Sequence, residues 1–283
     1  MTAVTATLPR RRVPPWLSSN RIMLCVAGVI VLLTLAAALV PGVLAPGDPA
    51  ALHPDQVLRG PGQGTLLGTD QYGRSVLALL VHGARTAVVI GLSSVALAAT
   101  AGTVLGLLAG YLGGIVDSAL GRLVDILMCF PGVLLALVIT AGLGASRLNL
   151  VLGVAVATMP VFARVMRGQV MAVRGRLFVQ AARATGLRRT RVLLRHVLPN
   201  AIAPVVVLAT VSVGTSIVLA ASLSFLGLGP SSDVPDWGQL LSSGQPYLAN
   251  AWWVSTFPGL ALTLVVISVS LLGDWLRDRM DRE

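Results

Sequence analysis

The 283-residue sequence contains no lysine, and all 21 of its basic residues are arginine. A Walker A loop needs a lysine after its glycines to reach nucleotide phosphates, so a standard nucleotide-binding loop is excluded. The three histidines, His53, His82 and His196, are scattered over different segments and imply no metal site. Cysteine is equally scarce: Cys25 and Cys129 both fall in apolar runs and are expected to be packing residues. Without a nucleophile elbow or an HExxH motif, we expect no enzyme, no cofactor and no metal in this chain.

Charge is also scarce, since only 11% of the residues are charged while 55% are hydrophobic, and the mean hydropathy is +0.84. A membrane-spanning helix needs about 20 apolar residues. Six apolar runs are candidates, at 22–40, 86–114, 126–146, 148–163, 197–226 and 249–273. No alternating ten-residue strands of a barrel accompany them. The sequence therefore predicts an all-α integral membrane protein with six transmembrane helices.

The arginines are distributed unevenly along the chain. If the N-terminus is cytosolic and the six runs alternate in direction, all but four of the 21 arginines face the cytosol. The four exceptions are Arg59, Arg74, Arg85 and Arg147. Because cytosolic connections of membrane proteins carry an excess of arginine, both termini are predicted to be cytosolic. Nucleic acid is the rival explanation of the net charge of +10, but nucleic-acid patches occur on soluble domains, so we expect lipids and no nucleic acid as partners.

The runs and connections predict the organisation of the chain. We expect a cytosolic tail (1–21), a first transmembrane helix (22–45), an external connection (46–85), a core of five transmembrane helices (86–277) and a second cytosolic tail (278–283). The end of the connection, 75–85, has apolar residues at helical spacing and is interpreted as an amphipathic helix leading into the second span. Within the core, 167–196 is expected to be a cytosolic loop and 227–248 an external loop.

Small residues and prolines mark the predicted spans. A stripe of four glycines at every fourth position, Gly102, Gly106, Gly110 and Gly114, predicts close approach of a neighbouring helix. Four prolines inside the runs, Pro131, Pro160, Pro204 and Pro258, remove backbone hydrogen bonds and favour bends. No acidic residue lies at the centre of a run, which disfavours a carrier driven by protons or sodium ions. Asp117 and Asp125, on either side of Arg122, are expected to form surface ion pairs.

The densest group of arginines lies in VQAARATGLRRTRVLLRHVLPN, residues 179–200. Gln180, Ala181 and Ala182 favour a helix with little bulk, so one of its surfaces can dock closely against a partner. Gly186 permits the backbone conformation that ends such a helix, and Pro199 suits the start of the next span. Apolar side chains that follow form one stripe: Leu187, Val192, Leu193 and Val197. The segment therefore predicts a helix, a turn and a second helix, which either dock a partner or only hold the topology.

This pattern of paired alanines, Gly186 and the closing Leu198 and Pro199 resembles the EAA loop of ABC-transporter permease subunits. The blocks GTDQYGRSVLALLVHGARTA, GGIVDSALGRLVDILMCFPGVLLA and SFLGLGPSSDVPDWGQLL resemble the C-type subunit of dipeptide, oligopeptide and nickel importers, and the likeness extends over 67–274. The resemblance implies a subunit of a bacterial plasma (inner) membrane importer, and implies that the loop between the fourth and fifth spans is a coupling helix fitting a groove on an ATPase. The coupling residues implied are Gln180, Ala181, Ala182, Gly186, Leu187, Leu198 and Pro199. Gln180 departs from the family pattern, which has glutamate there.

The resemblance also implies the partners and the solute. They are a sister B-type permease, one or two ATPase subunits that bind ATP and magnesium, and an external solute-binding protein. Peptides are the expected solute, with nickel, glutathione or haem as alternatives. An ATPase-independent carrier or channel and a membrane scaffold are the rival functions. Five outer residues are candidate contacts for the binding protein, namely Asp70, Arg74, Asp233, Asp236 and Trp237, although a turn and a lipid-directed cation explain the first two as well.

Overall fold

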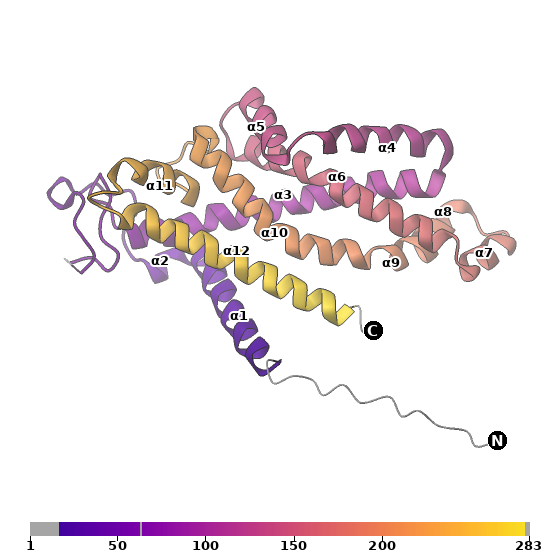
Figure 1. Ribbon diagram of the computed structural model, residues 1–283, viewed down its shortest axis with the longest axis horizontal. Helices are drawn as coiled ribbons and strands as arrows, with labels where there is room; N and C mark the ends of the chain where they lie inside the picture. The colour runs from indigo at the N-terminus through magenta and orange to yellow at the C-terminus, as the bar shows by residue number, and fades with distance from the viewer. Residues whose placement is uncertain (1–16, 63, 281–283) are drawn as a thin grey trace, which may run out of the picture.

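A computed structural model of the protein describes residues 17–62 and 64–280, and this part of the chain is largely helical (Figure 1). Five long helices form its body: α1 (Leu17–Leu39), α3 (Val76–Leu112), α6 (Arg147–Arg174), α10 (Ala203–Leu223) and α12 (Trp253–Met280). Shorter α-helices connect them: α2 (Pro41–Leu44), α4 (Gly114–Cys129), α5 (Gly132–Leu143), α7 (Leu177–Ala184), α8 (Arg189–Val192), α9 (Leu198–Ala201) and α11 (Trp237–Gly244). Two 3-10 turns, Pro54–Gln56 and Gln245–Tyr247, and two π-helical turns, Leu193–Val197 and Ser224–Leu228, complete the described elements. Most of the predicted N-terminal tail and the last three residues lie outside the described residues.

Each of the five long helices contains a segment long and apolar enough to cross a membrane, and α4 with α5 makes a sixth if this bent pair is one span. The bend that Pro131 favours within the apolar run 126–146 is confirmed, because the chain turns by 94° between α4 and α5. Phe130 has an extended backbone there, with φ −90° and ψ 138°. Pro131 is responsible, since a proline lacks the amide hydrogen and disfavours helical geometry at the residue before it.

The predicted amphipathic helix at 75–85 leads into the second span without a break, so α3 is one helix of 37 residues. Nothing between Val76 and Leu112 interrupts it, because no proline occurs there and its glycines lie where a neighbour packs. The fourth run likewise extends beyond Ala163, since α6 continues through Pro160 and past Arg164 to Arg174.

Packing of α3 against α6 forms the centre of the molecule, and three of the four striped glycines make the contact. A Cβ atom at Gly102 would lie 2.6 Å from Cβ of Phe162, and one at Gly110 would lie 2.9 Å from Cβ of Val170. At Gly114 nothing lies within 4 Å of such an atom. The predicted close approach is therefore confirmed for the first three glycines and wrong for Gly114, which begins α4 instead.

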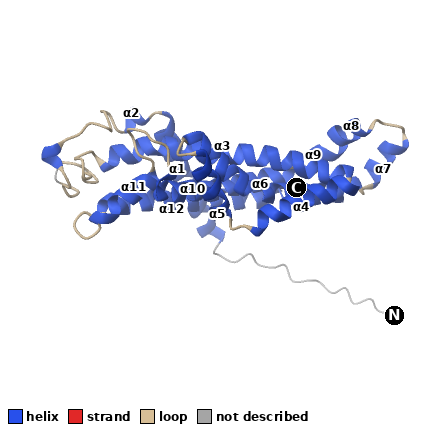
Figure 2. Ribbon diagram, turned by 90° about the horizontal axis from the view of Figure 1, so that it is seen from above, coloured by secondary structure: helices blue, strands red, loops and turns tan. Residues whose placement is uncertain are grey.

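The two ends of the molecule differ in character. α7 and α8 lie at one end, whereas the connection between α2 and α3 lies with α11 at the other (Figures 1 and 2). α1 begins and α12 ends on the side directed toward α7 and α8 (Figure 1). The two ends of the described chain thus face the same way.

Candidate functional site

The segment 175–192, which we name the elbow, has the helix–turn–helix form predicted for it. α7 ends at Ala184, and after the turn α8 starts at Arg189. Gly186 lies in the turn with φ +80°, and a Cβ atom built on it would meet nothing within 4 Å. Glycine is thus required here by the left-handed backbone and not by lack of space.

One face of the elbow is anchored in the core of the bundle. Val179 and Val192 are fully buried, in the same cluster as Phe162 and Met166 of α6. A buried valine contributes about 1.5–3 kcal/mol relative to an exposed one, so this face holds the elbow firmly.

The predicted coupling residues, of which Leu198 and Pro199 lie beyond the elbow in α9, divide into a packed group and a solvent-facing group. Ala182 is buried, and Leu187 and Leu198 pack against the core cluster, so these three hold the segment in place. The solvent-facing members of the set are Gln180, Ala181, Gly186 and Pro199. The exposed face of α7 also carries Leu177, Phe178 and Arg183, so apolar and charged side chains surround the small Ala181 there.

Gln180, which takes the place of the glutamate in the family pattern, has a defined role in the turn before α7. Its Nε2 donates a hydrogen bond of 2.9 Å to the carbonyl oxygen of Gly175, just after the end of α6. An ionised glutamate has no hydrogen to donate at that position. The amide therefore fastens α7 to the end of α6 in a way that a glutamate does not.

Tyr111, near the C-terminal end of α3, joins the elbow to a second long helix. Its hydroxyl donates a hydrogen bond of 2.7 Å to the carbonyl oxygen of Arg189, and the guanidinium of Arg183 lies 5.5 Å from the centre of its ring. Close by, Nη1 of Arg174 donates to the carbonyl oxygen of Gly110 at 2.6 Å. The elbow is thus in contact with α3 as well as with α6.

The expected ion pairs of Asp117 and Asp125 form with α6 and not with Arg122. Arg167 Nη2 donates to Asp117 at 2.8 Å, and Arg164 Nη2 donates to Asp125 at 2.7 Å. The second pair is largely exposed and is a surface pair, as predicted. A polar cavity of about 290 Å³ lies between α3, α4 and α6 and is lined by both pairs and by Arg122.

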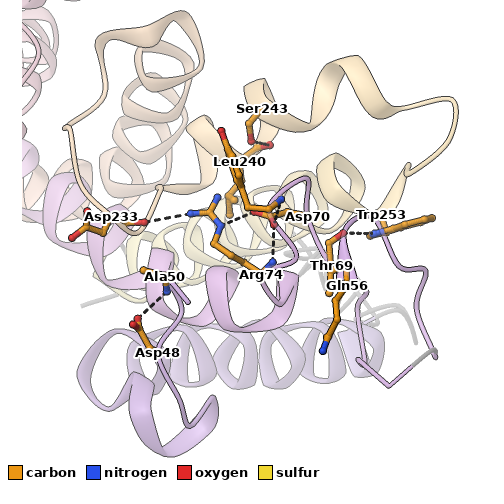
Figure 3. A network of polar contacts seen from close by, with 11 residues as sticks. Asp48, Ala50, Gln56, Thr69, Asp70, Arg74, Asp233, Leu240, Ser243 and Trp253 are labelled. Atoms are coloured by element: carbon orange, nitrogen blue, oxygen red, sulfur yellow. Dashed lines mark hydrogen bonds and ion pairs between the residues drawn. The ribbon is translucent and has the colours of Figure 1, made fainter. Parts of the chain in front are cut away.

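At the opposite end, the connection before α3 is fastened to the rest of the molecule by polar contacts, which form what we call the outer platform (Figure 3). Asp70 Oδ2 accepts a hydrogen bond from Arg74 Nε at 2.7 Å, and both side chains are largely buried. Arg74 Nη1 also donates to the carbonyl oxygen of Asp233 at 3.4 Å, which joins the connection to the loop before α11. Trp253 Nε1 donates to the carbonyl oxygen of Thr69 at 3.0 Å.

α11 is held by Asp236, the residue that caps its start, and by Trp237, its first residue. Asp236 caps the helix, with Oδ1 accepting from the amides of Gly238 and Gln239 at 2.8 and 3.1 Å. Trp237 is buried, and its Nε1 donates to the carbonyl oxygen of Leu80 on α3 at 2.9 Å. Burial raises the pKa of the Asp236 carboxyl, and the two amide hydrogen bonds oppose that rise only in part.

The five predicted outer contact residues are therefore brought together as one structure, but not as one exposed surface. Asp70, Asp236 and Trp237 are buried, and each has a partner within the chain. Asp233 is exposed at the rim, next to Arg74. Of the three predicted carboxylates, Asp233 is therefore the one that a partner at this end can reach.

Comparison with known proteins identifies the family and the fold. Residues 102–283 match the family described as the binding-protein-dependent transport system inner membrane component. The chain belongs to this family.

Individual relatives match a larger part of this chain than the family match does. The chain is 37% identical to the dipeptide transport system permease protein DppC of Alkalihalophilus pseudofirmus, over 98% of this chain and 91% of that one. It is 41% identical to the di/tripeptide transport system permease protein DppC of Pseudomonas aeruginosa, over 84% and 80%. It is also 37% identical to the glutathione transport system permease protein GsiD of Pectobacterium atrosepticum, over 90% and 85%.

Solved structures show the same arrangement of helices. The inward-facing MetNI methionine ABC transporter superposes with a TM-score of 0.55 at 20% identity, covering 71% of this chain and 95% of that chain. An amino acid ABC transporter with histidines gives a TM-score of 0.51 at 17% identity, covering 68% and 91%. The fold of this transport component is therefore that of ABC-transporter permease chains.

Two features of this transport component were missed by reasoning from its sequence. Tyr111 gave no signal, because a lone tyrosine at a helix end has no characteristic spacing. The attachment of α4 to α6 was missed because arginine and aspartate about 40–50 positions apart show no periodicity. Only the fold brings Asp117 to Arg167 and Asp125 to Arg164.

Proposed function

We propose that this chain is the permease subunit of an ATP-driven importer of short peptides and that the elbow couples it to an ATPase. The observation that carries the proposal is the division of the elbow into a buried face and an exposed face. Val179 and Val192 anchor it in the core, while Gln180 and Ala181 face outward. A partner that moves the exposed face must move the anchoring helices with it.

Force applied to the elbow has a direct path through the molecule. α6 is a continuous helix of 28 residues, so it extends roughly 42 Å at 1.5 Å per residue. The glycine contacts join α6 to α3, and Tyr111 joins α3 to the elbow. When two ATPase domains close on ATP, the pair α3 and α6 tilts as one body. This tilt opens a path shared with a sister permease alternately to the outside and to the cytosol.

The elbow belongs on the cytosolic side in this proposal, and the outer platform on the external side. Nine arginines of 164–195 then face the cytosol, in accord with the excess of positive charge on that side. The partners are a sister B-type permease, one or two ATPase subunits and an external solute-binding protein, in a bacterial plasma membrane. ATP and magnesium are bound by the ATPase, and this chain contributes a path and its positioning.

The outer platform is proposed to receive the binding protein. Asp233 provides an exposed carboxylate, and the loop that carries it is fixed by Arg74. Arg74 precedes α3 and Asp233 precedes α11. A loaded binding protein that docks on this loop therefore acts on both helices together.

Peptides are the proposed solute because two of the relatives named above are permeases for dipeptides and di/tripeptides, and the third is a permease for glutathione, itself a small peptide. The test is purification of this chain from its native membrane in mild detergent, followed by identification of every associated chain. Proteoliposomes of the recovered complex are then supplied with labelled dipeptide or glutathione. ATP-dependent uptake of either supports an importer of that solute. Recovery of the chain alone, with solute uptake driven by an ion gradient, contradicts the proposal.

A further inference from the structure

An apolar groove of about 460 Å³ lies among α1, α3, α10 and α12, away from both the elbow and the outer platform. Its walls are almost entirely aliphatic, with Leu35 on α1, Leu92 on α3, Ile217 on α10 and Val265 and Leu276 on α12 among the lining residues. Its two hydroxyls already bond within their own helices, Thr34 to the carbonyl oxygen of Ile30 and Thr210 to that of Val207. The groove therefore offers a hydrocarbon chain an apolar surface with no unsatisfied polar group.

The groove ends at an aromatic residue and a cation. Trp275 lines it, and the guanidinium of Arg279 lies 4.8 Å from the centre of the Trp275 ring. Asp274 and Arg277 line a different cavity, against α6 and α10. Among the charged residues at this end of α12, which also include the exposed Asp278, Arg279 is the one that contacts a residue lining the groove. Tryptophan and arginine at one end of an apolar surface are typical of the boundary between hydrocarbon and headgroups.

The length of the groove distinguishes a lipid acyl chain from a helix of another subunit as its occupant. Along α12 its walls extend from Val265 to Leu276, which is about 16 Å at 1.5 Å per residue. One leaflet contributes about 15 Å of the hydrocarbon core, and a helix of another subunit needs about 30 Å. α1 and α12 diverge toward the end of the molecule that carries α7 (Figure 1), so the groove opens within one leaflet.

From this geometry we propose that the groove binds one anionic phospholipid of the cytosolic leaflet. One of its two acyl chains lies between α1 and α12, and its phosphate lies at Arg279, which the Trp275 ring holds in position. The cation–π contact restrains the guanidinium, so less side-chain freedom is lost when the phosphate binds. This site does not depend on which solute the protein carries.

The test compares lipids retained by the complete transporter. The complex is purified in mild detergent and incubated with dipalmitoyl phosphatidylglycerol or with dipalmitoyl phosphatidylcholine. Bound lipids are then counted by native mass spectrometry. The wild type is expected to retain one phosphatidylglycerol in preference to phosphatidylcholine. Arg279→Gln is expected to weaken phosphatidylglycerol binding about five-fold, the effect of one arginine near an anionic headgroup. Leu35→Trp, which fills the groove from α1, is expected to lose the bound lipid of either kind.

Arg59→Gln is the matched control, since Arg59 is an exposed arginine of the external connection, and it is expected to keep the wild-type preference. Three results overturn the proposal. They are equal retention of the two lipids by the wild type, an unchanged preference in Arg279→Gln, and cross-links from Leu35 to a helix of the sister subunit in place of lipid. Assembly of each variant with its ATPase shows that the variant is folded.

Discussion

Gly106 on α3 lies directly against the carbonyl oxygen of Ala163 on α6, so closely that no side chain fits between them. A Cβ atom at this position would also lie 2.8 Å from Cβ of Met166. The contact is the tightest point of the joint between the two helices that carry the elbow.

Replacement of Gly106 by alanine is expected to lower the free energy of unfolding by about 1–3 kcal/mol, because the new methyl group forces α3 and α6 apart. The measurement is the thermal unfolding midpoint of the purified complex. Gly121→Ala is the control, since Gly121 lies within helix α4 and nothing lies within 4 Å of its added Cβ atom. Equal Tm values for the two variants would show that the helices are not in contact at Gly106.

Removal of the Asp70 charge is expected to loosen the outer platform. Arg74 would keep its buried position without its carboxylate partner, and breaking such a pair costs about 3 kcal/mol. Hydrogen exchange of the amides of 53–74 in Asp70→Asn is expected to rise strongly. Asp125→Asn breaks an exposed pair instead and is expected to cost less than about 1 kcal/mol. If the amides of 53–74 exchange as slowly in Asp70→Asn as in the wild type, this pair has no structural role.

Asp236 gives the stability of the α11 region a defined pH dependence. Because burial raises the pKa of this carboxyl in the folded protein, the folded state binds its proton more tightly than the unfolded state does. The stabilising contribution of protonation is complete below the ordinary value of 3.8 and is lost as the pH rises through the raised pKa. Relative to Asp236→Asn, which does not titrate, the wild type is expected to gain stability as the pH falls through that window. The measurement is urea unfolding of both proteins at several pH values. A wild type that loses stability relative to Asp236→Asn as the pH falls would contradict this prediction.

Gly186 is the position at which coupling and folding can be separated. Proline cannot adopt its φ of +80°, so Gly186→Pro is expected to redirect α7 while leaving the protein in the membrane. Asparagine tolerates the left-handed region, so Gly186→Asn is the control and is expected to keep most of the transport activity. The measurement is ATP-dependent peptide uptake at matched membrane content. Normal uptake by Gly186→Pro would remove the elbow from the coupling mechanism.

Features with a local cause could be predicted from the sequence. Apolar runs gave the long helices, the glycine spacing gave the joint between α3 and α6, and Gly186 gave the turn of the elbow. The bend at Pro131 was harder to predict, because a proline is compatible with either a kinked helix or a break. Pro160 and Pro258 lie in helices that continue through them.

Long-range features of the site needed the fold. The charges of Asp70 and Asp236 and the ring of Trp237 suggested surface contacts, yet all three side chains are buried in the fold. A polar residue in a connection can contact a partner or fasten the chain to itself, and its residue type does not distinguish these roles. The position of Tyr111 beside Arg189 likewise depends on the packing of α3 against the elbow.

The most direct test of the central claim is uptake of labelled dipeptide into proteoliposomes that contain the complete transporter, with ATP inside and the binding protein outside. The account predicts uptake that requires both ATP and the binding protein and that is abolished by Gly186→Pro but not by Gly186→Asn. Uptake that continues without ATP or the binding protein, or that is equal in the two variants, would contradict it.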